Sequence, residues 1–220
     1  MAKDETLREA FIEELRDTFD AEQQIIKALR KMVKAANSAT LRAAFATHLE
    51  ETHAQVARLE QVFASLDEKI RGKHCDGMAG IIAEAKSIID ADFDDATTDA
   101  CLVAAAQRVE HYEIAAYGAL IAWANVLGHR EAASLLEQTL EEEKETDEKL
   151  TALADGGINQ EAAGNADRDD ETTSTRNAAA AKGRSAASVG KKVKKADKAK
   201  ADKATKAEKV KKTGKAKGRR

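Results

Sequence analysis

The chain has 220 residues, no proline and only 4% aromatic residues, whereas 34% of its residues are charged. This length allows one domain with a sizeable core and excludes two large ones. The charged N-terminus lacks the apolar core of a signal peptide, and no run approaches the ~18 apolar residues of a membrane span. The composition predicts an all-α cytoplasmic protein in which Cys75 and Cys101 remain as free thiols.

The formal net charge of −3 conceals an uneven distribution along the chain. From Arg176 onward there are 18 basic residues against three acidic ones, a net charge of +15, so the preceding part carries −18. Residues 157–220 contain almost no large apolar side chains, and such a segment cannot bury enough surface to offset its ordering entropy. We therefore predict a helical domain over residues 1–156 and a disordered linker and Lys/Ala-rich tail over residues 157–220.

The first 155 residues show apolar side chains at alternating three- and four-residue spacing, which is typical of amphipathic helices. Ser38 is expected to cap the second helix, and Gly128 and the Asp155-Gly156-Gly157 run are expected to end the last two. The predicted helices cover approximately residues 3–36, 39–66, 78–91, 98–127 and 130–154. Four long helices and one short one predict a four-helix bundle with one additional short helix.

The long helices carry acids on or beside the faces that they are expected to bury. With about 100° per residue, Glu113 lies at the centre of the apolar stripe of its helix, and Glu110 lies about 60° away. Glu22 and Glu143 lie within the stripes of the first and last helices, and Asp147 lies about 40° from Glu143. An unpaired buried carboxylate costs several kcal/mol, so this repeated placement needs a compensating charge.

The second helix offers Glu50 and His53, which are spaced so that both can reach one ion. His53 lies about 40° from Leu49, and Glu50 lies near the edge of the stripe at about 100°. A single Glu near an apolar stripe commonly reaches solvent or pairs with a lysine, so each residue alone is weak evidence. Together they match the bundle site with one Glu from each of two helices and Glu-x-x-His from the others. The pattern predicts a carboxylate-bridged di-metal site holding iron or manganese.

Three runs carry a family resemblance: QRVEHYEIAAYGAL (107–120), LRDTFDAEQQIIKAL (15–29) and LEQTLEEEKETDEKLTALA (136–154). They resemble the YciE/YciF family of bacterial ferritin-like proteins, over about residues 5–155. The resemblance implies a ferritin-like bundle, a homodimer, a di-metal site and induction under stress, without an established biochemical activity. Carried over by position, it implies metal ligation by Glu22, Glu50, His53, Glu110, Glu113 and Glu143, with Asp147 as the nearest alternative where Thr146 replaces a second histidine.

Several other reactive side chains have a weaker case. Tyr112 and Tyr117 flank the predicted site, where core packing is their favoured role over electron or proton relay. Cys75 lies in a glycine-rich loop with little nearby to lower its thiol pKa. The remaining histidines have no partner at ligand spacing; these are His48, His74, His111 and His129.

The basic tail predicts a second function. Residues 182–220 resemble the C-terminal tails of linker histones, which bind DNA phosphates by counterion release. The alternatives are a tail that folds back on the acidic body and one that binds an anionic membrane surface. Three hypotheses follow: a nucleoid-associated stress protein that oxidises Fe(II) with peroxide or dioxygen near DNA, a metal-dependent oxidoreductase with an unknown substrate, or a non-catalytic nucleoid or stress scaffold.

Overall fold

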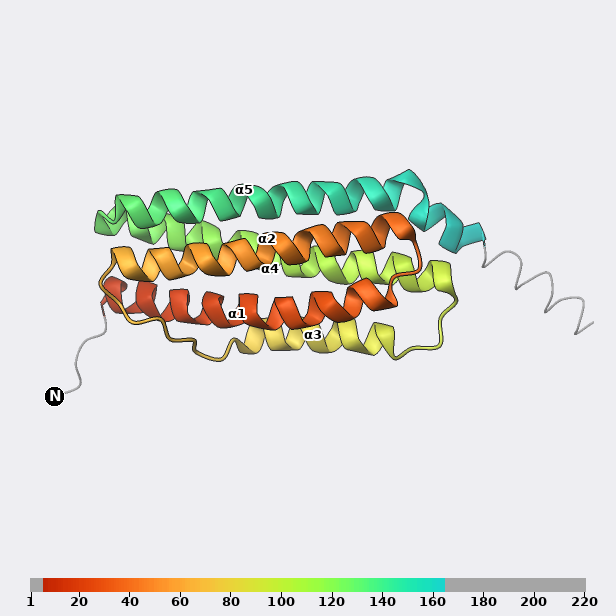
Figure 1. Cartoon of the computed structure of the whole chain (residues 1–220), viewed down its shortest axis with the longest axis horizontal. Coiled ribbons are helices and arrows are strands. Elements are labelled where there is room, and N and C mark those ends of the chain that lie inside the picture. The colour runs from red at the N-terminus through yellow and green to blue at the C-terminus, as the bar shows by residue number, and fades with distance from the viewer. Residues whose placement is uncertain (1–5, 165–220) are drawn as a thin grey trace, which may run out of the picture. The chain divides into compact units, whose positions relative to one another are not determined.

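The computed structural model describes residues 6–164, and it confirms the all-α fold class (Figure 1). The helices are α1 (Leu7–Ala35), α2 (Ala39–Ser65), α3 (Asp76–Ile89), α4 (Asp95–Leu127) and α5 (Arg130–Leu153), followed by a π-helical turn, η1 (Ala154–Ile158). Within residues 6–164 there is no strand, and no helix is long and apolar enough to cross a membrane. Most of the predicted disordered tail, including the predicted DNA-binding residues 182–220, lies outside the described residues.

The four long helices form the bundle, because α1 contacts α2, α2 contacts α5, α5 contacts α4, and α4 contacts α1. The short helix α3 packs against α1 and α4 on the outside of the bundle (Figure 1). The connection that contains α3 runs along the bundle, so α2 and α4 point in the same direction (Figure 1). One long crossover of this kind characterises ferritin-like bundles. The predicted ferritin-like bundle with an additional short helix is therefore confirmed.

Local interactions fix the helix ends close to the predicted boundaries. Ser38 caps α2, where its side chain accepts a hydrogen bond from the N–H of Leu41. Gly128 ends α4 in the left-handed conformation with φ of 80°, which glycine adopts without a Cβ penalty. Buried Asp99 of α4 accepts hydrogen bonds from the backbone N–H groups of Asn37 (2.8 Å) and Ser38 (2.6 Å). Asp99 therefore ties the α1–α2 turn to α4 and sets the relative position of three long helices.

The α5 end differs from the prediction. The α-helix stops at Leu153, but the chain continues through η1 and in helical conformation to residue 164. Gly157 has φ of 147°, so the glycine bends the helix and does not terminate it. Ala154 and Ile158 are buried against the end of the bundle, and this burial stabilises the extra turns. The expectation that residues 157–164 are disordered is therefore wrong.

The interior consists of two apolar clusters separated along the bundle axis. Each long helix contributes to both clusters, and each has a polar position between its two contributions. The first cluster includes Ile25, Leu29, Phe45, Leu102, Val109 and Leu150. The second includes Phe11, Leu15, Leu59, Tyr117, Leu120 and Leu136. The two clusters hold the four helices in register, so that polar side chains from each helix meet at one level.

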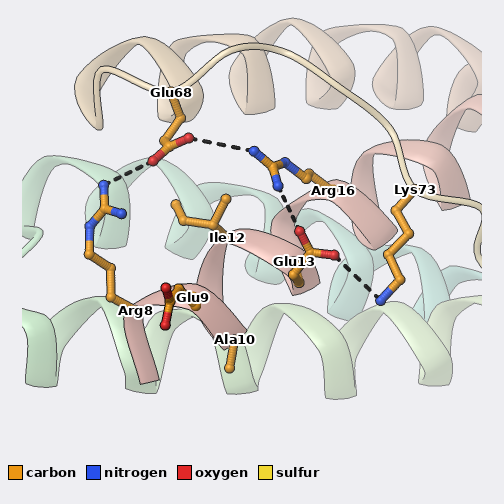
Figure 2. Close-up of a pocket in the computed structure, with 8 residues that line it drawn as sticks. All are labelled: Arg8, Glu9, Ala10, Ile12, Glu13, Arg16, Glu68 and Lys73. Carbon is orange, nitrogen blue, oxygen red and sulfur yellow. Dashed lines mark hydrogen bonds and ion pairs between the residues drawn. The ribbon is translucent and has the colours of Figure 1, made fainter. Parts of the chain in front are cut away.

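The connection between α2 and α3 is held on α1 by a chain of ion pairs (Figure 2). Glu68 pairs with Arg8 at 2.9 Å and with Arg16 at 3.6 Å, and Glu13 pairs with Arg16 at 2.6 Å and Lys73 at 3.7 Å. The Lys73 N–H also donates to the Arg16 carbonyl at 3.0 Å. Because these charged side chains pair with one another, they fasten the connection to α1.

Candidate metal centre

Five buried ionisable side chains meet at the level between the two apolar clusters. They are Glu22 of α1, His48 of α2, Glu110 and Glu113 of α4, and Glu143 of α5, and none is more than 3% exposed. His48, Glu110, Glu113 and Glu143 each offer a ligand atom, and these four atoms lie within 4.8 Å of one another. Side chains from all four long helices therefore converge on one small volume.

The direct contacts within the group are few. His48 Nε2 lies 3.3 Å from Glu110 Oε1, and His48 Nδ1 lies 3.7 Å from Oε2 of Glu51, one turn further along α2. Buried Tyr117 donates a short hydrogen bond from its hydroxyl to Glu22 Oε1. Glu51 and Tyr117 are thus placed to orient two members of the group, His48 and Glu22.

Most polar atoms of the group lack a hydrogen-bond partner. Both oxygens of Glu113 and of Glu143, and one oxygen each of Glu22 and Glu110, are buried without one. Both ring nitrogens of His48 also have no partner that meets hydrogen-bond geometry. An unsatisfied buried polar group costs about 1–3 kcal/mol, and more when it is charged. With its carboxylates ionised, this group is therefore left energetically unsatisfied by the protein alone.

The pKa values of the buried glutamates also indicate that negative charge in this group is uncompensated. Burial and the neighbouring Glu143 carboxylate together raise the pKa of Glu22 to about 8, although the Tyr117 hydrogen bond opposes the shift. Burial and the neighbouring Glu143 carboxylate raise the pKa of Glu110 and of Glu113 well above the ordinary value. Burial also raises the pKa of Glu143. In the absence of a cation, the group therefore holds protons at pH values where an exposed glutamate is ionised.

A metal ion fits these observations. A cation replaces the missing positive charge and gives the orphaned oxygens and the imidazole a common partner. Oxygen-rich donor sets of this type are known in the cores of four-helix bundles. The buried group of His48, Glu110, Glu113 and Glu143 can hold a metal ion, and Glu22 lies beside it.

The predicted site residues fall into two sets. The structure brings together Glu22, Glu110, Glu113 and Glu143, all on the buried faces of their helices. Asp147 is only partly buried and lies outside the group, where its carboxylate pairs with His111 at 3.3 Å. Its second oxygen accepts a hydrogen bond from Gln107 at 3.4 Å. The Asp147 carboxylate is thus already used at the bundle surface.

The expectation for α2 is wrong, because Glu50 and His53 are both exposed and do not face the core. The buried face of α2 instead follows a strict alternation of three- and four-residue steps: Leu41, Phe45, His48, Thr52, Gln55, Leu59 and Val62. Three consecutive members of that series are polar, so a stripe drawn through apolar residues alone passes through Leu49 and Val56, which are only partly buried. Extending the Leu41–Phe45 and Leu59–Val62 spacing inward would have found His48.

The comparisons with known proteins agree with the fold. Residues 6–163 match the family model described as a domain of unknown function (DUF892). The chain is 48% identical over 158 residues to protein YciF of Escherichia coli strain K12. The alignment covers 71% of this chain and 95% of YciF.

Two solved structures align along nearly their whole length. The crystal structure of the E. coli stress protein YciF has a TM-score of 0.69 and covers 70% of this chain and 98% of that chain. The structure of YcfI from Rhodopseudomonas palustris is 44% identical, with a TM-score of 0.66, and covers 69% of this chain and 97% of that chain. The family match ends at residue 163, before the basic tail begins.

Proposed function

This chain belongs to the DUF892 family and is a relative of YciF. On that basis we propose that its helical bundle binds a pair of iron or manganese ions, which carry out redox chemistry in a stress response. The observation that carries the proposal is the set of six buried carboxylate oxygens without hydrogen-bond partners, on Glu22, Glu110, Glu113 and Glu143. Such oxygens favour hard divalent ions, and one imidazole is compatible with iron.

The proposed ligands are Glu22, His48, Glu110, Glu113 and Glu143. When bound, iron would supply electrons for the reduction of dioxygen or hydrogen peroxide. The protein's own part is to hold the ligands in a buried, shaped site, with Glu51 orienting His48 and Tyr117 orienting Glu22. Interaction with His48 lowers the pKa of Glu51, which keeps a carboxylate against the far side of the imidazole. The two apolar clusters exclude water from both ends of the site.

Metal content of the full-length chain tests the proposal. After anaerobic reconstitution with Fe(II) or Mn(II) and removal of free metal, elemental analysis should find about two ions per chain. The Glu113→Ala/Glu143→Ala variant should lose them while its helicity, measured by circular dichroism, is retained. The matched control is Glu50→Ala/Glu148→Ala, which removes two exposed acids from the same bundle and should leave metal content unchanged. An absence of bound metal in the unmodified chain would refute the site and favour the non-catalytic scaffold.

The reaction is tested separately on the metal-loaded protein. Addition of hydrogen peroxide or dioxygen to the Fe(II)-loaded chain should produce ferric absorption within a single turnover. Metal binding without any such oxidation would leave a structural metal. Oxidation that continues only when an organic compound is added would favour the alternative of an oxidoreductase with another substrate.

We also propose that the basic tail, residues 182–220, binds DNA, because its lysines are spaced by small residues without aromatic side chains. A gel shift should show a complex with the full chain that weakens steeply as salt rises, and no complex with a chain that ends at Gly164. Equal binding by both forms would place the DNA contact elsewhere. The same two proteins, compared by light scattering, test the homodimer that the family resemblance implies.

A further inference from the structure

A small cavity connects the buried group to the surface between α2 and α5. It has a volume of about 140 Å³, and its inner wall contains His48 and Glu110, two members of the proposed metal site. Phe45 and Leu150 line its sides. Thr146 also lines it, with a buried hydroxyl that has no hydrogen-bond partner. The cavity therefore reaches the ligands and not merely the helix surface.

The mouth of the cavity carries opposite charges that pair with each other. Lys149 Nζ lies 3.7 Å from Glu51 Oε1, and both residues line the cavity, with side chains 54% and 29% exposed. Lys149 also pairs with Glu145 at 3.9 Å. Because these charges compensate one another, the mouth offers no unpaired charge that would select an ionic ligand.

The volume restricts what can enter. One water occupies about 30 Å³ of liquid, so the cavity holds the equivalent of four or five waters. Pockets for larger organic ligands have volumes of about 300–1,000 Å³. Dioxygen and hydrogen peroxide fit this space, and an organic substrate of ordinary metabolite size does not.

We propose that this cavity is the route by which a small uncharged oxidant, of the size of dioxygen or hydrogen peroxide, reaches the buried group. The choice of oxidant as the occupant rests on the proposed function, whereas the role of the cavity as an entry route does not. Two arms of the experiment separate these statements: the first uses metal-free protein, and the second uses Fe(II)-loaded protein.

The first arm measures access with a thiol placed at the inner wall. Thr146→Cys is made in a Cys101→Ser background, because Cys101 is partly exposed, whereas Cys75 is buried. The matched control is Thr18→Cys, since Thr18 is also buried with an unpartnered hydroxyl but does not line the cavity. Methyl methanethiosulfonate should modify the thiol at position 146 at least about tenfold faster than the thiol at 18, which reacts only through local opening. Equal rates would refute the route.

Reagent size and a plug then test the dimensions. A dansyl thiosulfonate should lose most of the advantage at position 146, because it exceeds the cavity. Ala44→Phe fills the cavity from α2 and should slow methylthiolation at 146, whereas Ala46→Phe, on an exposed position of the same helix, should not. Thr47→Trp, at the exposed mouth, provides a second plug if Ala44→Phe alters the circular dichroism spectrum. An unchanged rate in both plugged variants would overturn the proposal.

The second arm follows nitric oxide, an uncharged diatomic probe, as it binds the Fe(II)-loaded protein in a stopped-flow spectrometer. Ala44→Phe should slow association several-fold at unchanged iron content, and Ala46→Phe should behave like the parent. If the chain binds no iron, the proposed function fails, while the thiol experiment still decides the route. If iron binds and Ala44→Phe leaves the association rate unchanged, the route fails and the metal site stands.

Discussion

His48 Nε2 lies 3.3 Å from Glu110 Oε1, between the diagonally opposed helices α2 and α4, and both side chains are buried. The contact joins the only histidine of the buried group to an acid on the helix that runs in the same direction (Figure 1). Because α2 and α4 lie diagonally in the bundle, this pair spans its centre, and Glu22 and Glu143 approach from the other two helices.

The placement of His48 predicts that the two histidines of α2, His48 and His53, differ in their contribution to metal affinity. His48→Ala should lower the affinity for Fe(II) or Mn(II) at least about a hundredfold, since loss of even an outer-sphere partner commonly costs 10–100-fold. His53→Ala should have no effect, because His53 is exposed on α2. Competitive titration against a fluorescent chelator measures both affinities. Equal losses in the two variants would contradict the ligand set.

The raised pKa of Glu22 predicts that the metal-free protein loses stability as pH rises. In the unfolded chain this carboxyl ionises near its ordinary value of 4.5, but in the folded chain it keeps its proton to about 8. Its contribution to stability is complete below about pH 4.5 and is lost progressively as the pH rises toward 8, by roughly 1.4 kcal/mol per pH unit for one group. Glu110 and Glu113 act in the same direction.

Urea denaturation of the metal-free protein between pH 5 and pH 8 measures this dependence. Glu22→Gln removes one titrating group with little change in shape and should flatten the curve. Glu50→Gln, at an exposed position, should leave the slope unchanged. Bound metal should reverse the trend, because it requires deprotonated ligands. A metal-free protein that is more stable at pH 8 than at pH 5 would contradict the assignment of raised pKa values.

Tyr117 and Tyr112 should respond differently to loss of the hydroxyl. Tyr117→Phe leaves a buried Glu22 oxygen without its donor and should reduce the free energy of unfolding by about 1–3 kcal/mol. It should also raise the pKa of Glu22 further, since the Tyr117 hydrogen bond lowers it. Tyr112→Phe removes contacts to Cys75 (3.1 Å) and Asp17 (3.4 Å) in a partly exposed setting, so about 0.5–1.5 kcal/mol is expected. Thermal and urea unfolding measure both changes.

Two glycines of α3 provide a matched pair. A Cβ at Gly77 would lie 2.8 Å from Cε2 and 2.9 Å from the hydroxyl oxygen of Tyr112, whereas a Cβ at Gly80 would meet nothing within 4 Å. Gly80→Ala should therefore stabilise the protein by about 0.5–1 kcal/mol through helix propensity and lower unfolded-state entropy. Gly77→Ala should lose that gain, because the Tyr112 ring must move away from Cys75. A Gly77→Ala variant as stable as Gly80→Ala would show that the ring yields without cost.

Spacing along the chain was sufficient to predict the elements. The three- and four-residue repeats, Ser38 and Gly128 located the five helices within a few residues, because amphipathic faces and caps are local properties. The same spacing correctly predicted that Glu22, Glu113 and Glu143 face the core. The prediction that the helix ends at the Asp155–Gly157 run was wrong, because the apolar contacts of Ala154 and Ile158 keep the chain helical beyond it.

The sequence by itself determined that the protein is a bundle of long helices with acids on three inward faces. Only the tertiary structure decided which face of α2 is buried, so that His48 and not His53 joins the buried group. It also placed Glu50 and Asp147 outside that group. The physical reason is that a polar face is buried only where the other helices bring compatible groups against it. That condition depends on all four helices together, so it cannot be predicted from the residue spacing of any one helix.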